Sequence, residues 1–436
     1  VMDEKGDSRL TLETVRELIT KDESNVKINS LEEEPGSGRG DNYTSMLYRI
    51  RAKGQKHSET TGEWINYERA IIYKVLPQSR EHREAFKSEL LFRNEVAFYT
   101  YAWPTLNKLQ TTDGNVFNGV AKIYAARIDL IAMEDLRERG FKMADRRKGL
   151  EIDHLKRALK ALAGFHALSL TLRETRQVEY KFARLTDPDG NHGIREVLFR
   201  TENEDWYRQY YQEAAKSAIE MVSEGLSTHM EPKRTEIMGK LRAFLEDDVF
   251  FRTMSEVAAV RGPLTVICHG DCWTNNILFK YKMHITIYKT CTYQDVCLVD
   301  FQLTRVGSLA LDLVNFLYCC TSGEIRRTHM TQLLQHYHFH LMSSLHRLNP
   351  EQPAKDPSVM WELLNEEMRR CGRFGIGLAL DILPISTCES EEAPDMYEKP
   401  ETGKEKQKTR APPRGGAECA RLMTDLVLEL VQNHAL

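Results

Sequence analysis

The chain has 436 residues, of which 41% are hydrophobic and 28% are charged, and its formal net charge is −4. This length is sufficient for two compact lobes with their own cores, and the composition is that of an ordinary soluble globular protein. A net negative charge argues against general nucleic-acid binding, which requires a strongly basic surface. No apolar run approaches the roughly 20 residues that span a bilayer, so no membrane partner is expected.

The N-terminal stretch and the cysteines bear on cellular location. The chain begins VMDEKGDSRLTLETV, which is acidic and polar, whereas a signal peptide is basic and then apolar. All nine cysteines lie from Cys268 onward and show no paired CxxC spacing, so neither a zinc site nor a disulfide framework is indicated. We therefore expect a cytoplasmic protein with reduced cysteines. The sequence leaves its oligomeric state open.

The first predicted elements are a short amphipathic helix over residues 10–19 and two strands over residues 26–28 and 46–50. Between the strands lies a turn-rich loop, GSGRGDNYTS, that contains Gly38 and Gly40. Such a loop can cover the phosphates of ATP, because glycine lets backbone N–H groups approach an anion. It is also common as a simple hairpin turn, and the third glycine of G-x-G-x-x-G is absent.

The next predicted strand, residues 70–77, is apolar and holds one lysine, Lys74. A lysine inside such a strand is costly unless its ammonium group meets an anion. The helix predicted over residues 81–101 carries Glu95 in or beside its apolar stripe. We therefore predict a Lys74–Glu95 ion pair beside the phosphates of a nucleotide. The alternative is that both are surface residues with buried stems.

Two further strands are predicted over residues 119–126 and 129–133, and the rest of the chain is mainly helical. Strong helical patterns cover residues 151–170, 331–348, 360–383 and 418–434. His166 lies on the apolar face of the first of these helices, where a satisfied core histidine is the expected role. The aromatic cluster of Trp206, Tyr207, Tyr210 and Tyr211 is expected to pack in the core, although it is also a candidate border for a substrate pocket.

The most informative stretch runs from residue 266 to residue 312. It reads as a strand, a tight loop His269-Gly270-Asp271, a second strand after Asn276, and a third strand that ends at Asp300. Two carboxylates and an amide are thus predicted at the tips of neighbouring strands. Phosphoryl transfer from ATP requires a carboxylate for the acceptor hydroxyl, and an amide and a second carboxylate for magnesium. This order and spacing match the kinase signature in outline, with His-Gly-Asp and Asp-Phe-Gln in place of its usual wording.

The wording HGDCWTNNILFKY followed by DFQLTRVGSLALDL resembles the ecdysteroid-kinase-like family of arthropods, which is related to choline kinase and aminoglycoside phosphotransferases. The resemblance implies an α+β, two-lobed protein-kinase-like fold. Its N-terminal lobe, residues 1–133, would be an antiparallel sheet that binds ATP, and its larger, mainly helical lobe, residues 134–436, would bind the substrate. It further implies that Asp312 anchors the catalytic loop.

The same resemblance extends to the nucleotide site. Its wording Gly-x-Asn-Tyr-x-Ser is matched by Gly40, Asn42, Tyr43 and Ser45. Backbone groups from Met133 to Asp135 would bind adenine at the hinge. The residues predicted to bind the cofactors, ATP and Mg²⁺, are then Gly38, Gly40, Asn42, Ser45, Lys74, Glu95, Met133 and Asp135. The predicted catalytic residues are Asp271, Asn276 and Asp300, with Asn276 and Asp300 as the metal ligands.

The predicted function is ATP-dependent phosphorylation of a hydroxyl on an ecdysteroid or a similar lipophilic alcohol. The alternatives are a kinase for choline, ethanolamine, an aminoglycoside or a xenobiotic, and a nucleotide-binding pseudokinase scaffold. A pseudokinase is disfavoured because every catalytic side chain is present, and a protein kinase because no Ala-Pro-Glu segment follows Asp300. The connection over residues 282–294 is longer than expected for the family, and as an insertion it should loop outward.

Overall fold

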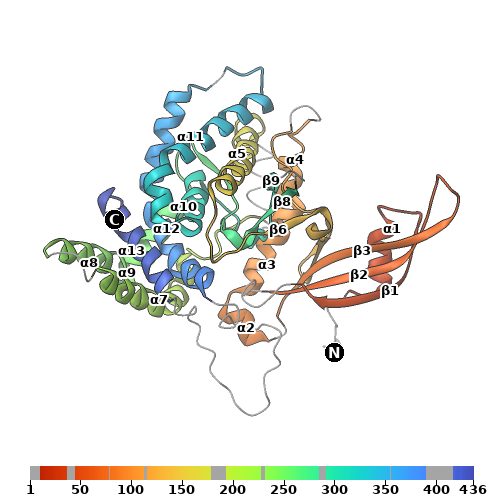
Figure 1. Cartoon of the computed structure of the whole chain (residues 1–436), viewed down its shortest axis with the longest axis horizontal. Coiled ribbons are helices and arrows are strands. Elements are labelled where there is room, and N and C mark those ends of the chain that lie inside the picture. The colour runs from red at the N-terminus through yellow and green to blue at the C-terminus, as the bar shows by residue number, and fades with distance from the viewer. Residues whose placement is uncertain are drawn as a thin grey trace, which may run out of the picture.

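The computed structural model describes residues 10–36, 45–77, 79–111, 115–177, 193–226, 231–283, 291–353, 355–388 and 416–436. An antiparallel sheet lies at one end of the molecule and a large helical part at the other (Figure 1). The predicted α+β, two-lobed architecture is confirmed. The predicted lobe boundary between residues 133 and 134 stays a prediction.

The N-terminal sheet contains β1 (Val26–Pro35), β2 (Met46–His57), β3 (Trp64–Val75), β4 (Ile123–Arg127) and β5 (Leu130–Glu134), in the order β1-β2-β3-β5-β4. Neighbouring strands are antiparallel, and α1 (Leu12–Thr20) contributes Val15 and Ile19 to the core of this lobe.

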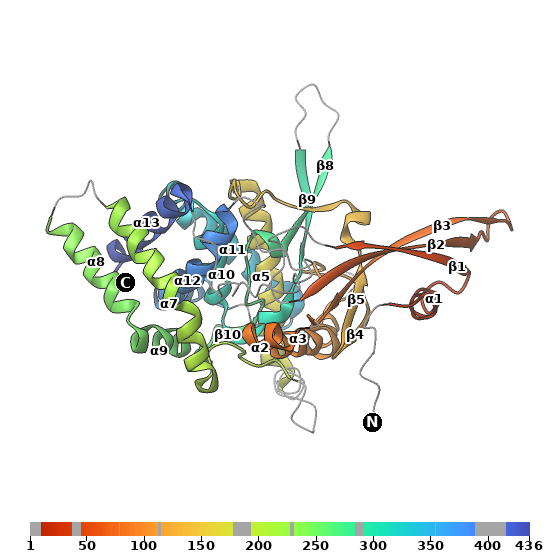
Figure 2. The ribbon, with the colours of Figure 1, turned by 90° about the horizontal axis from the view of Figure 1, so that it is seen from below.

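The first three strands are longer than the sequence predicted, and they extend away from the rest of the protein (Figure 2). Their outer halves are rich in charged residues and therefore lack the apolar runs that signal a strand. Cross-strand ion pairs form there instead, such as Lys53–Glu32 at 2.6 Å. Such pairs contribute about 0.2–1 kcal/mol each to the stability of a sheet. The backbone pairing of β2 with β1 and β3 also stabilises these outer halves.

The single helix predicted over residues 81–101 is wrong in its continuity. The chain forms α2 (Arg80–Ala85) and α3 (Ser88–Ala97), then a π-helical turn (Phe98–Ala102) and α4 (Trp103–Asn107). The break falls at Lys87, whose φ of 54° is left-handed and cannot continue a right-handed helix. As a result, α3 packs on the segment that begins at Phe301 and carries Glu95 into the interior.

The C-terminal part is built around α10 (Leu309–Cys320), every residue of which is buried. Helix α12 (Pro357–Thr387) packs along α10, and α11 (Gly323–Leu348) packs on α5 (Ile152–Thr175). The remaining helices in this part are α7 (Glu204–Gly225), α8 (Lys233–Phe244), α9 (Asp247–Ala258) and α13 (Ala417–Gln432). Their apolar faces meet in one large core. This core also includes Val266, Ile277 and Leu298, from the strands next to the predicted catalytic residues.

Short strands form much of the stretch from residue 266 to residue 312, which contains the predicted catalytic residues. Strand β7 (Thr265–Cys268) pairs with β10 (Arg305–Ser308), and β8 (Ile277–Met283) lies between β6 (Phe141–Met143) and β9 (Cys291–Leu298). The two ends of the connection over residues 282–294 are paired strand, because Lys282 faces Thr292 and Met283 faces Cys291 across β8 and β9. Residues 284–290 lie outside the described residues. Within the described ranges, no helix is long and apolar enough to cross a membrane.

Candidate active site

The predicted catalytic loop, called the catalytic loop below, begins at the end of β7 with His269-Gly270-Asp271. Gly270 has a φ of +87°, and a Cβ placed on it would lie 1.8 Å from the carbonyl oxygen of Leu303. Any larger residue is therefore excluded by both backbone conformation and space. The glycine lets the loop pass directly beneath the segment that follows Asp300.

Asp312, at the start of α10, holds this loop from below. Its Oδ2 accepts from the His269 N–H at 2.7 Å, and its Oδ1 accepts from the Gly270 N–H at 2.8 Å. His166 of α5 donates from Nε2 to Oδ2 at 3.0 Å, and its Nδ1 lies 2.7 Å from the Tyr337 hydroxyl. Burial raises the pKa of Asp312, but the hydrogen bonds from His166 and Gly270 outweigh it, so the pKa lies below its usual value. His166 is thus a satisfied core histidine, as expected. Its hydrogen bond also fixes the Asp312 carboxylate that binds the catalytic loop.

The predicted catalytic residues meet at one end of β8 and β9. Asn276 donates from Nδ2 to Asp271 Oδ2 at 2.8 Å, and its backbone oxygen accepts from the Val299 N–H at 3.0 Å. That bond places Asn276 next to Asp300, which follows Val299. Burial, together with the charge of Asp300, raises the pKa of Asp271 to about 7. A carboxylate with a pKa near the working pH is suited to accept a proton.

Asp300 and the phenylalanine after it are held in a defined position. Asp300 has a φ of 65°, an unusual left-handed conformation that directs its side chain back toward the N-terminal lobe. Phe301 stacks on Phe98 with ring centroids 3.7 Å apart and planes within 7°. The ring of His269 lies 4.5 Å from the Phe301 centroid, and its Nε2 bonds to the Val299 oxygen at 2.9 Å.

Lys74 of β3 joins the two lobes. Its Nζ lies 2.6 Å from Glu95 Oε2 and 2.6 Å from Asp300 Oδ1. Burial lowers the pKa of this ammonium, but the two carboxylates outweigh burial and raise it, so Lys74 is charged. The predicted ion pair of Lys74 with Glu95 is present in the structure. The Lys74 side chain is 3% exposed and the Glu95 side chain is 1% exposed. Its second partner, Asp300, is 226 residues away in the sequence.

Asn94 is a site residue that the sequence analysis missed. Its Nδ2 donates to the carbonyl oxygens of Gln302 at 3.0 Å and Thr304 at 2.7 Å, and its Oδ1 accepts from the Arg195 N–H at 3.0 Å. One buried amide thus fixes the segment after Asp300 to α3. Its position next to Glu95 on an apolar helix was the only available signal.

The predicted nucleotide-binding residues are only partly described. Gly38, Gly40 and Asn42 lie outside the described residues. Ser45 is buried at the start of β2, and Met133 is buried on β5, paired with Ile72.

Asp135 follows at the predicted hinge. Its side chain is occupied by Arg49 at 2.6 Å and by the backbone and side chain of Arg137. It caps the short helix Leu136–Arg139, so any adenine contact at this residue would come from its backbone.

The aromatic cluster is largely core, as expected, but it meets a carboxylate that the sequence analysis missed. Tyr207 is fully buried and stacks on Tyr211 with centroids 4.2 Å apart. The Tyr211 hydroxyl donates to Asp381 Oδ2 on α12, 170 residues further along the chain. Burial raises the pKa of Asp381 to about 7, and the nearby charge of Asp271 adds to the rise.

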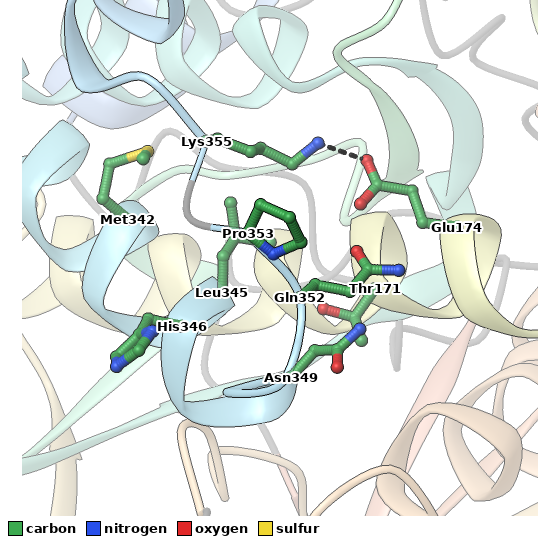
Figure 3. A pocket seen from close by; sticks show the side chains of 9 residues that line it. All are labelled: Thr171, Glu174, Met342, Leu345, His346, Asn349, Gln352, Pro353 and Lys355. Carbon is green, nitrogen blue, oxygen red and sulfur yellow. Dashed lines mark hydrogen bonds and ion pairs between the residues drawn. The ribbon is translucent and has the colours of Figure 1, made fainter.

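A separate pocket lies between the C-terminal ends of α5 and α11 and the segment that leads to α12 (Figure 3). Its charged groups, Glu174 and Lys355, are paired with each other at 2.6 Å. None of the predicted site residues lines it. We therefore place neither nucleotide nor acceptor there.

A lysine that bridges a helix glutamate and a strand-end aspartate, opposite an Asp–Asn pair on a glycine-bearing loop, is the arrangement expected in a kinase-like phosphotransferase. The ecdysteroid kinase-like family model matches residues 39–350. The chain belongs to this family and is a small-molecule phosphotransferase. No curated protein matches it.

Several solved structures are similar to the whole chain or most of it. An ethanolamine kinase of Plasmodium vivax aligns over 99% of both chains at 13% identity with a TM-score of 0.40. The ADP-bound aminoglycoside phosphotransferase APH(2'')-Ib covers 84% of this chain and 99% of its own at 12% identity, with a TM-score of 0.30. APH(2'')-IIa, in a ternary complex with streptomycin and ATP, covers 83% and 96% at 12% identity, also with a TM-score of 0.30. The family assignment rests on the family model and not on these alignments.

Proposed function

We propose that this protein transfers the γ-phosphate of ATP to a hydroxyl of an ecdysteroid or a similar lipophilic alcohol. The observation that carries the proposal is the meeting of Lys74, Glu95 and Asp300 across the two lobes, 2.6 Å apart at each contact. This ion-pair chain sits beside the Asp271–Asn276 pair, as phosphoryl transfer to an alcohol requires. Family membership supports the lipophilic acceptor.

Asp271 is assigned to the acceptor hydroxyl. It accepts the proton of that hydroxyl and orients its oxygen toward the γ-phosphate. The Asn276 amide bonds to one carboxylate oxygen and so fixes its direction. Removal of such a base typically costs about 10²- to 10⁴-fold in rate.

Asn276 and Asp300 are assigned to magnesium, and their chemistry fits that ion. Asn276 uses its amide nitrogen to bond to Asp271, which leaves its amide oxygen for a cation. Asp300 contributes a carboxylate that is 20% exposed and is bound at Oδ1 by Lys74. Hard divalent cations prefer such oxygen ligands. When bound, magnesium neutralises negative charge on the phosphates.

Lys74 and Glu95 are assigned to ATP. In the nucleotide complex, the Lys74 ammonium contacts phosphate oxygens, and Glu95 holds it in position from the buried side. Gly38, Gly40, Asn42 and Ser45 are proposed to cover the phosphates through backbone N–H groups. Backbone groups from Met133 to Asp135 are proposed to bind adenine.

A screen of the purified protein tests the proposal. Ecdysteroids, amino alcohols and plant toxins are incubated with ATP and magnesium, and mass spectrometry detects the added phosphate. We expect steroid phosphate in the wild type and none with Asp271→Asn. Robust phosphocholine without steroid phosphate would overturn the acceptor class. Binding of Mg-ATP without transfer to any acceptor would support the pseudokinase alternative.

A further inference from the structure

Asp381 lies on the side of α12 that faces strands β7 and β10. Arg305 is the first residue of β10. Its guanidinium lies 5.2 Å from the ring centroid of Phe374, on α12, and 5.2 Å from that of Phe199, which precedes α7. Arg305 pairs with Cys268 of β7, the residue before the catalytic loop. Asp381 follows Phe374 by seven residues, which is two helical turns along the same side. Its carboxylate therefore lies on the same flank of the site as Asp271.

One oxygen of Asp381 has no hydrogen-bond partner in the described part of the chain. The Tyr211 hydroxyl donates to Oδ2, whereas Oδ1 is buried and makes no hydrogen bond to any described residue. A buried polar atom without a partner destabilises the folded state. Such an atom in a native structure calls for an explanation, and a ligand supplies one. The pKa of about 7 caused by burial is a further sign of incomplete solvation.

The tyrosines beside Asp381 do not form a cage for a cation. Tyr207 is fully buried and Tyr211 is 4% exposed. The Tyr207 ring packs against Phe199, Phe250 and Phe251 at 5.3, 5.7 and 5.4 Å. A quaternary ammonium needs accessible ring faces, and these are covered. It also has no N–H to donate to Oδ1, whereas a neutral hydroxyl has one O–H.

We propose that Asp381 selects the acceptor by accepting, at Oδ1, a hydrogen bond from a second hydroxyl of a neutral polyhydroxylated molecule whose reacting hydroxyl lies at Asp271. Tyr211 holds the carboxylate in place through Oδ2. The inference rests on the proposed function and deepens it, because it adds a requirement for at least two hydroxyl groups. A site built to bond a hydroxyl discriminates strongly against an analogue that lacks it.

The test compares Asp381→Asn with the wild type on ecdysone and on a series of analogues that each lack one hydroxyl. The Asn side chain keeps the size of Asp but places an N–H₂ group where Oδ1 accepts. We expect the KM for ecdysone to rise roughly 10- to 100-fold, since hydrogen bonds to charged groups contribute about 1.5–3 kcal/mol. The KM for ATP should stay within about twofold. Glu366→Gln, on the exposed side of α12, is the matched control and should leave both KM values unchanged.

The analogue series separates direct contact from indirect disturbance. For one analogue, the wild type and Asp381→Asn should have equal KM values, because the hydroxyl that Asp381 binds is already missing. An equal rise on every analogue, or no rise on ecdysone, would overturn the inference and leave the kinase proposal standing. If the Asn variant folds poorly, Asp381→Ser gives the same comparison with a smaller side chain.

Choline and ethanolamine are the remaining probes. Their phosphorylation by the wild type, with a KM that rises in Asp381→Asn, would show that Asp381 binds a cation and would overturn the neutral-hydroxyl inference. If the wild type phosphorylates none of the probes while it binds Mg-ATP, the proposed function fails, and this inference fails with it.

Discussion

The two sides of the catalytic loop use buried carboxylates in opposite ways. On the closed side, Asp312, His166 and Tyr337 are at most 1% exposed, and both oxygens of Asp312 accept hydrogen bonds. On the open side, Asp271 and Asp381 are partly exposed, and Oδ1 of Asp381 has no hydrogen-bond partner among the described residues. Hydrogen bonds lower the pKa of Asp312, whereas burial raises the pKa of both open-side groups to about 7.

This difference separates anchoring from reactivity. A carboxylate whose oxygens are satisfied by the protein gains nothing from a ligand, so it stabilises the fold. A carboxylate with a raised pKa and a free oxygen is poised to accept a proton or a hydrogen bond. Substitutions on the open side should therefore reduce catalysis at little cost in stability, and substitutions on the closed side should do the reverse.

Asp271→Asn should have the largest effect on rate. The amide keeps the size of the side chain and removes the base, so we expect kcat to fall about 10²- to 10⁴-fold. The Kd for Mg-ATP and the melting temperature should change little, because the proposed role of Asp271 is confined to the acceptor. Steady-state kinetics measure kcat, ATP titration measures the Kd, and thermal denaturation measures the melting temperature. Turnover near the wild-type value would remove Asp271 from this role.

Asp312→Asn should have the largest effect on stability. Its amide N–H₂ would face the N–H groups of His269 or Gly270, and breaking a buried network of this kind costs about 3–5 kcal/mol. Chemical denaturation measures the loss. Asp248→Asn, an exposed residue of α9, is the control and should change stability by no more than about 0.5 kcal/mol.

The Asp312 comparison also has a pH dependence with a defined sign. Because the folded pKa of Asp312 lies below its usual value, its stabilisation is complete above the unfolded pKa of about 3.9. It is lost as the pH falls through the folded pKa. The stability difference between wild type and Asp312→Asn should therefore be constant from about pH 5 to 7 and shrink below about pH 4. A difference that grows on acidification would contradict this assignment.

Asp300→Asn tests the metal assignment on the open side. Loss of an outer partner of a metal ligand typically costs about 10- to 100-fold in metal affinity, so loss of the ligand charge should raise the half-saturating magnesium concentration by at least about tenfold. Magnesium titration of the initial rate measures it. An unchanged half-saturating concentration in the variant would count against metal ligation by Asp300.

Asn94→Ala should have the smallest effect of the four. It leaves the carbonyls of Gln302 and Thr304 and the N–H of Arg195 without their amide partner, at an expected cost of about 1–3 kcal/mol in stability. Because this amide fixes the segment after Asp300, kcat should fall along with stability. A normal kcat in a destabilised variant would show that the segment keeps its position without Asn94.

Local signals made half of the site predictable. The spacing of His269, Asp271, Asn276 and Asp300 is a property of one loop and two strands, so it can be read along the chain. Lys74 and Glu95 followed from the cost of an apolar strand with a single ammonium. The break at Lys87 was missed, because no residue there signals a left-handed backbone.

The acceptor side was not predictable from the same signals. Asp381 lies in the apolar C-terminal part of α12 and 170 residues from Tyr211, so no periodicity links them. A search for acidic residues near the aromatic cluster in sequence finds only charges on the same helix. Tertiary packing alone brings α7 and α12 together and places Asp381 near Asp271.

The most direct test of the central claim is the ratio of ADP formed to acceptor phosphorylated. The purified protein is incubated with magnesium, ATP and ecdysone, and ADP and steroid phosphate are quantified in the same samples. The account predicts one steroid phosphate for each ADP in the wild type and neither product with Asp271→Asn. ADP accompanied only by inorganic phosphate, or steroid phosphate formed at the wild-type rate by Asp271→Asn, would contradict it.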